Sequence, residues 1–175
     1  MLNSLDRPAQ GRVAVMPRDE ISRLLNGAPA QALLQSSIPV RFAYTALGGS
    51  PRVVPLAFHW DGERFVICTL PGSPKVRAVK ANLHVAMKID TQAFPPHILL
   101  VRGTATVQVV DGVPAEYLAA STKQVGAEGM ATFEAQVRAM YDQMVRIDVE
   151  PTWAKLIDFE TTLPSAVERL ARRHR

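Results

Sequence analysis

The chain has 175 residues, 47% of them hydrophobic and 21% charged, a composition typical of a folded protein and not of a disordered one. The formal net charge of +4 comes from the last seven residues, RLARRHR, because removing their four arginines leaves 16 basic and 16 acidic residues. The single cysteine, Cys68, excludes an internal disulfide, and no apolar run is long enough to span a membrane.

This charge distribution also bears on partners and location. A balanced body with a basic tail is typical of a solvated helix end, so we expect no nucleic-acid partner. A basic-tailed nucleic-acid binder is the weaker alternative, and it predicts salt-sensitive binding that disappears when residues 169–175 are removed. Residues 1–20 contain six charged side chains and no apolar stretch, so we expect no secretory signal, no membrane association and a cytoplasmic location.

The predicted elements begin with helices and continue with strands. Residues 16–37 predict two short helices, the first opened by Pro17 and closed by Asn26 and Gly27. Alternating patterns and turn residues, including the Asp61-Gly62 hairpin signal, then predict a run of strands broken by one short helix. The strands are expected at 40–47, 52–60, 64–69, 84–90 and 97–110, and the helix at 75–82.

The last third of the chain changes period twice. An apolar stripe through 130–145 predicts a helix after a shorter one that begins near Pro114, strands are expected over 146–160, and SAVERLARRHR predicts a final helix. These patterns predict an α+β fold, mainly antiparallel, with helices at its edges. We expect one domain over 1–175, with an N-terminal helical segment at 1–36 and a basic C-terminal helix or tail at 166–175.

The segment CTLPGSPKVRAVKANLHVAMKID, residues 68–90, contains the strongest candidate binding site. Two hydroxyls, Thr69 and Ser73, flank a Pro-Gly turn, and the cations Lys75 and Arg77 open the helix that follows. A phosphate needs several donors that converge from a compact turn and a cation that neutralises it, and this stretch supplies both. A plain surface turn would carry a similar pattern, so the residues alone leave both interpretations open.

Other catalytic patterns are missing from the sequence. The four histidines show no metal-ligand spacing, so we expect no metal site. No nucleophile elbow, Walker loop or dinucleotide-binding glycine pattern is present. His59 and His97, both on expected strands, are candidate proton donors or ring contacts, and a structural role in the sheet is the alternative for each.

In its order of motifs, the segment RVVPLAFHWDGERFVICTLPGSPKVRAVKANLHVAMKID resembles the core of the pyridoxamine-phosphate-oxidase-like, flavin-binding split-barrel family. The strands FPPHILLVRGTATVQVV and VEPTWAKLIDFETTLPSA resemble the downstream strands of its smaller bacterial members. The resemblance implies a six-stranded, Greek-key split β-barrel with peripheral helices. It also implies a homodimer with two cofactor sites at its interface.

The resemblance assigns roles by matching position. Thr69, Ser73 and Lys75 would hold the cofactor phosphate, with Arg77 as a helper. The strand from Val54 to His59 would run beside the flavin ring, and the partner subunit would close the site around 96–99 and Trp153. The cofactor-binding residues implied are therefore Val54, Pro55, Leu56, Phe58, Thr69, Ser73, Lys75, Arg77 and Trp153.

Two departures from the family's vitamin B6 oxidase bear on the reaction. Pro74 stands where that enzyme typically has arginine before the turn lysine, and its C-terminal arginine signature is not recognisable in TTLPSAVERLARRHR. The resemblance therefore implies an oxidoreductase that uses FMN, or alternatively the deazaflavin coenzyme F420, to transfer hydride to or from a small organic substrate. A split-barrel protein that binds flavin or haem without turnover is the alternative.

Overall fold

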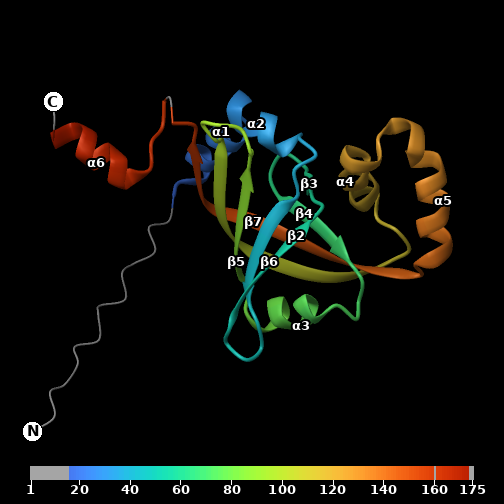
Figure 1. Cartoon of the computed structure of the whole chain (residues 1–175). Coiled ribbons are helices and arrows are strands. Elements are labelled where there is room, and N and C mark those ends of the chain that lie inside the picture. The colour runs from blue at the N-terminus through green and yellow to red at the C-terminus, as the bar shows by residue number, and fades with distance from the viewer. Residues whose placement is uncertain (1–15, 160, 174–175) are drawn as a thin grey trace, which may run out of the picture.

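The computed structural model of the chain describes residues 16–159 and 161–173. Seven strands form one antiparallel sheet in the order β2-β1-β5-β6-β7-β4-β3, with helices at its periphery (Figure 1). The strands are β1 (Val40–Thr45), β2 (Pro51–Leu56), β3 (His59–Trp60), β4 (Phe65–Thr69), β5 (His84–Asp90), β6 (Ile98–Asp111) and β7 (Gln143–Ile157). The helices are α1 (Arg18–Leu25), α2 (Ala28–Leu34), α3 (Pro74–Ala81), α4 (Ala115–Val125), η1 (Ala127–Gly129), α5 (Met130–Met140) and α6 (Ser165–Arg173).

The predicted α+β class with an antiparallel sheet and peripheral helices is confirmed, but the sheet has seven strands and not six. The extra strand arises because the expected strand at 52–60 is divided into β2 and β3, which lie at opposite edges of the sheet. Only Ala57 and Phe58 connect them, so Leu56 and His59 are at most about 11 Å apart. The sheet must therefore curl enough to bring these two strand ends close together, but it remains open, because no ladder joins β2 to β3 among the described residues.

The long strands β6 and β7 correct a second expectation. The helical stripe predicted through residue 145 ends at Met140, and Met144 lies on β7. β7 pairs with β6 along its whole length, from Gln143 opposite Asp111 to Ile157 opposite Ile98. The hydrogen bonds and side-chain contacts of this pairing outweigh a local helical pattern.

A bulge interrupts the β6–β7 ladder. Arg102 pairs with Trp153 and Gly103 with Pro151, so Thr152 has no partner of its own. A Cβ at Gly103 would lie 2.6 Å from the Glu150 carbonyl oxygen, a distance that no side chain tolerates. Glycine at this position therefore allows the two backbones to approach, and the extra residue bends β7.

The core lies inside the curled sheet and is closed at one end by α1 and α2 (Figure 1). Inward residues of the strands, such as Phe42, Phe65 and Ile147, are fully buried there with Leu25 of α1. The observed α1, α2 and α6 lie within the segments expected to be helical. The remaining parts of those expectations, 1–15 and 174–175, lie outside the described residues. None of the helices in the described part of the chain is both long and apolar enough to cross a membrane.

Candidate functional site

The structure brings Thr69, Ser73 and Lys75 together at the end of β4, and we refer to these three residues as the Lys75 cluster. Lys75 Nζ donates to Ser73 Oγ at 2.6 Å and to Thr69 Oγ1 at 3.0 Å. The local fold explains the contact, because Ser73 is the extended residue before α3 and Pro74 occupies the first helical turn. Lysine at the second helical position therefore reaches back over the turn to the end of the strand.

Burial gives the Lys75 cluster an unbalanced charge. Desolvation lowers the pKa of Lys75, which means that its environment disfavours the ammonium form. Across 16–159 and 161–173, no carboxylate forms an ion pair with this lysine, and its two printed partners are neutral hydroxyls. The positive end of the α3 dipole lies at the same turn, although Pro74 has no N–H and the Val76 N–H donates to the Ser73 carbonyl oxygen. A bound anion would offset both features.

Arg77, the fourth predicted phosphate residue, lines a pocket next to the Lys75 cluster. Its exposed side chain lines a pocket of about 590 Å³ between α3 and the β1–β2 hairpin, which Pro74 also lines. Arg52 on β2 lines the same pocket. Arg52 could not be assigned to this pocket from the sequence, because nothing local in the sequence shows that β2 passes beside α3.

The predicted ring-contact residues of β2 divide between its two faces. Val54 and Leu56 are partly buried and pack against the core, and Val54 also lines the pocket beside α3. Pro55 is exposed on the outer face. The strand therefore borders the pocket next to the Lys75 cluster with Val54 and Arg52.

Phe58 lies in the core rather than on a surface. Its ring is 1% exposed and packs on Phe65 with 5.7 Å between the centroids. The ammonium of Lys123, from α4, lies 3.7 Å above the Phe58 ring and donates to the Leu34 carbonyl oxygen at 3.0 Å. Burial lowers the pKa of Lys123 to about 8. Lys123 thus ties α4 to the end of α2, which no sequence pattern predicted.

Neither candidate histidine lies with the Lys75 cluster. His59 pairs with Val66, so it is separated from Thr69 by three residues of β4, or about 10 Å along the strand. His97 precedes β6 in a turn, where its N–H donates to the Thr91 hydroxyl oxygen at 2.9 Å and its carbonyl oxygen accepts from the Thr91 N–H at 3.0 Å. Within one chain, both positions fit the structural alternative.

Trp153 is also remote from the Lys75 cluster within one chain. Thr69 pairs with Val145 on β7, and Trp153 lies eight residues further along that strand, about 26 Å away. The Arg102 guanidinium lies 4.6 Å from the Trp153 ring centroid on the outer face of the sheet.

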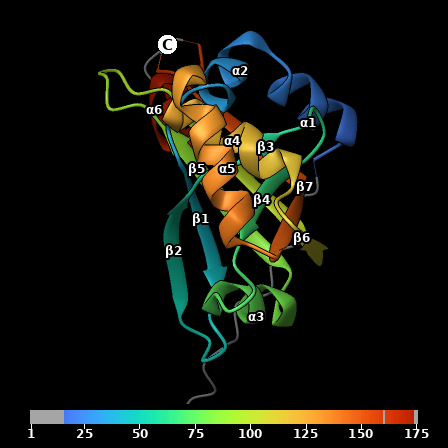
Figure 2. The ribbon, with the colours of Figure 1, turned by 90° about the vertical axis from the view of Figure 1, so that its right-hand side faces the viewer.

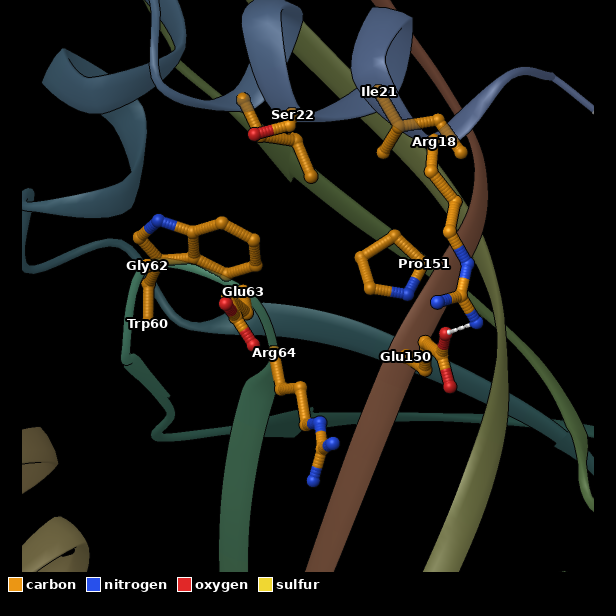
Figure 3. Close-up of a pocket in the computed structure, with 10 residues that line it drawn as sticks. Arg18, Ile21, Ser22, Trp60, Gly62, Glu63, Arg64, Glu150 and Pro151 are labelled. Carbon is orange, nitrogen blue, oxygen red and sulfur yellow. Dashed lines mark hydrogen bonds and ion pairs between the residues drawn. The ribbon is translucent and has the colours of Figure 1, made fainter.

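A separate pocket of about 260 Å³ lies at the opposite end of β4 (Figure 3). Trp60 and Pro151 form its walls and Ile21 of α1 its roof. Arg18 at its rim forms an ion pair with Glu150. Glu63 and Arg64, one negative and one positive side chain, also line the pocket. The lining charges are therefore balanced, unlike those of the Lys75 cluster.

The helices α4 and α5 lie over the outer face of β4 and β7 (Figure 2). Beneath them, Arg146, Glu116 and Asp148 form a cluster of charged residues. Arg146 lies 2.9 Å from Glu116 and 3.0 Å from Asp148. Burial raises the pKa of Asp148, and the nearby Arg146 charge opposes that rise. Burial likewise raises the pKa of the Cys68 thiol to about 12, so it stays protonated and inert. The described residues contain no group of three or more potential metal ligands.

Comparisons with known proteins place this arrangement in a family. A family model described as pyridoxamine 5'-phosphate oxidase matches residues 28–156, well over half of the chain. A solved F420 reductase is 28% identical, with a TM-score of 0.56 over 71% of this chain and 94% of that chain. No curated protein sequence matches the chain.

Two further solved structures share the fold at lower identity. A conserved hypothetical protein from Mycobacterium tuberculosis is 16% identical, with a TM-score of 0.57 over 85% of this chain and 89% of that chain. The haem storage protein of Vibrio cholerae is 15% identical, with a TM-score of 0.53 over 73% and 90% of the two chains. At these identities the likeness concerns the fold alone.

Proposed function

This chain belongs to the pyridoxamine 5'-phosphate oxidase family, and on that basis we propose that it is an oxidoreductase that binds FMN or the deazaflavin coenzyme F420. The observation that carries the proposal is the Lys75 cluster, in which a half-buried ammonium is held by two hydroxyls without a carboxylate partner. The likeness to an F420 reductase supports the same class of activity.

In this proposal the residues of the chain bind and orient, and the bound cofactor supplies the hydride chemistry. Lys75 neutralises a phosphate while the Thr69 and Ser73 hydroxyls donate hydrogen bonds to it. Arg77 and Arg52 supply further positive charge in the adjoining pocket. Because the cofactor does the chemistry, no acid or base is required among the side chains near the cluster.

The assembly is part of the proposal. We infer a single split-barrel domain that acts as a homodimer in the cytoplasm, with Trp153 and the segment around 96–99 of a second copy closing each site. The separation of up to about 26 Å between Trp153 and Thr69 along β7 supports this, since a second copy could place its Trp153 closer to the Lys75 cluster.

Titration of the purified full chain with FMN, and separately with F420, followed by cofactor fluorescence, tests the proposal. Lys75→Ala should weaken the affinity of the bound cofactor by about 10- to 150-fold, the value of a charge-assisted hydrogen bond of about 1.5–3 kcal/mol. Lys80→Ala is the matched control, because it removes the same charge from an exposed position in the last turn of α3. Equal affinities for the two variants would overturn the phosphate role.

A second substitution, Arg77→Gln, tests which of the two cofactors the chain binds. F420 carries an acidic tail beyond its phosphate, so Arg77→Gln should weaken F420 more than FMN if the pocket beside α3 holds that tail. Turnover is tested by reducing the bound cofactor without oxygen and adding electron acceptors. A cofactor that binds tightly but is never reoxidised would favour a binding protein without turnover.

A further inference from the structure

The outer face of β1, β2, β5 and β6 contains a hollow that the proposed function does not use. Its volume is about 380 Å³, within the range of small-molecule sites. We call it the Arg102 hollow, after the charged residue described below. It is lined by Ala43, Tyr44, Thr45, Pro51, Arg52, Val53, His84, Val85, Ala86, Arg102, Gly103 and Thr152.

The floor of the Arg102 hollow has a fixed shape. Gly103 and Thr152 line it, and both belong to the bulge where β6 and β7 approach too closely for any side chain at residue 103. The Thr152 hydroxyl donates to the Arg102 carbonyl oxygen at 3.3 Å, which ties the extra residue to the neighbouring strand. The concavity is therefore part of the backbone and does not depend on mobile side chains.

The charge of the lining is of one sign. Arg102 and Arg52 line the hollow, and no aspartate or glutamate does. The Arg102 guanidinium is held over the Trp153 ring at 4.6 Å and forms no ion pair with any carboxylate in the described ranges. Stacking of this kind orients a guanidinium and leaves its N–H groups free to bind a carboxylate.

The pocket of Figure 3 differs from the Arg102 hollow because its arginine already has a carboxylate partner. There, Arg18 is already paired with Glu150, and Glu63 adds a further negative charge to the lining. An anion entering that pocket would have to displace a carboxylate from Arg18. In the Arg102 hollow nothing has to be displaced.

The Arg102 hollow also adjoins the proposed cofactor site. Tyr44, Arg52 and Val53 line both this hollow and the pocket beside α3, whose wall includes Pro74 next to Lys75. A molecule in the hollow would therefore be a neighbour of a cofactor whose phosphate lies at the Lys75 cluster.

We propose that the Arg102 hollow is the substrate site and that the substrate is a small organic carboxylate with a flat apolar part. Arg102 binds the carboxylate, and the apolar part lies against Ala43, Val53 and Ala86. The assignment as substrate site rests on the proposed oxidoreductase function, whereas carboxylate binding itself does not.

Calorimetric titration of the full chain with benzoate and with benzamide, in the presence and absence of saturating FMN or F420, tests the inference. Benzamide has the same shape without the charge, so benzoate should bind at least about tenfold more tightly. Arg102→Gln should weaken benzoate about tenfold or more. Arg41→Gln is the matched control, because Arg41 is an exposed arginine of β1 that does not line the hollow.

The outcomes separate this inference from the proposed function. Benzoate binding that Arg102→Gln abolishes supports the site, and a benzoate affinity that rises or falls with bound cofactor supports its place beside the cofactor. Failure of benzoate to bind, or equal binding to Arg102→Gln, overturns the site even if FMN or F420 binds normally. Failure of both cofactors to bind, with benzoate bound as expected, overturns the proposed function and leaves the carboxylate site standing.

Discussion

The outer face of the sheet is covered by helices in one half, over β4 and the first part of β7, and is not covered in the other half, over β1, β2 and β5. Over β4 and the first part of β7, the helices α4 and α5 cover the strands (Figure 2), and the charged residue Arg146 is paired with Glu116 and Asp148. Over β1, β2 and β5 no described helix covers the outward residues, and Arg102 is left without a carboxylate. Burial therefore forces charges to pair in the covered half, while the bare half keeps a positive charge available for a ligand.

The covered half predicts the largest effect, on the reactivity of Cys68. A rise of its pKa from 9.0 to about 12 lowers the thiolate fraction at pH 8 by about 1000-fold. Alkylation by iodoacetamide should therefore be about 1000-fold slower in the folded chain than in the chain unfolded in urea. Rapid labelling under native conditions, followed by mass spectrometry, would show that α4 and α5 open easily and that the two halves are less different than the structure indicates.

In the uncovered half, a substitution at the β6–β7 bulge, which forms the floor of the Arg102 hollow, should reduce the stability of the fold. Gly103→Ala should lower the free energy of unfolding by about 3 kcal/mol, because the new methyl group would overlap Val149 and the Glu150 carbonyl oxygen. Urea denaturation measures the change. Gly72→Ala is the matched control, since a Cβ at Gly72 meets nothing within 4 Å. Similar stabilities for the two variants would mean that the bulge relaxes and does not fix the hollow.

The smallest effect concerns Lys123, which joins the covering helix α4 to the core. Its pKa is lowered from 10.5 to about 8 in the folded chain, so between these values the unfolded chain binds more protons. Stability due to Lys123 should therefore rise with pH through this window. Relative to Lys123→Met, the wild-type chain should gain about 1 kcal/mol between pH 7 and pH 9.5, after allowance for partial exposure. A pH-independent difference in urea denaturation would contradict the burial of its charge.

Predictability from sequence depended on how far apart the contacting residues are in the chain. The Lys75 cluster could be predicted because Thr69, Ser73 and Lys75 lie within seven residues, where a strand end, a proline turn and a helix start dictate geometry. Most strands could be placed for the same reason, from alternation and from turns such as Asp61-Gly62.

Features that depend on contacts between residues far apart in the sequence were predicted wrongly or were not predicted. Phe58 is enclosed by Phe65 and by Lys123, and the division of the expected strand at 52–60 follows from that burial together with the curl of the sheet. Arg52 could not be assigned to a pocket, because its neighbour Arg77 is 25 positions away in sequence. The end of α5 at Met140 depended on the pairing of β7 with β6.

The sequence by itself determined the α+β class, the antiparallel strands and the local group of hydroxyls around Lys75, since each follows from contacts between residues close in the chain. Tertiary structure alone decided which charges are paired and which are free. Arg146 of β7 pairs with Glu116 of α4, and Arg18 of α1 pairs with Glu150 at the surface, whereas Arg102 stacks on an aromatic ring and pairs with no carboxylate of the described residues. These differences arise because strand order and curvature, which bring distant residues together, are set by the burial of the whole core.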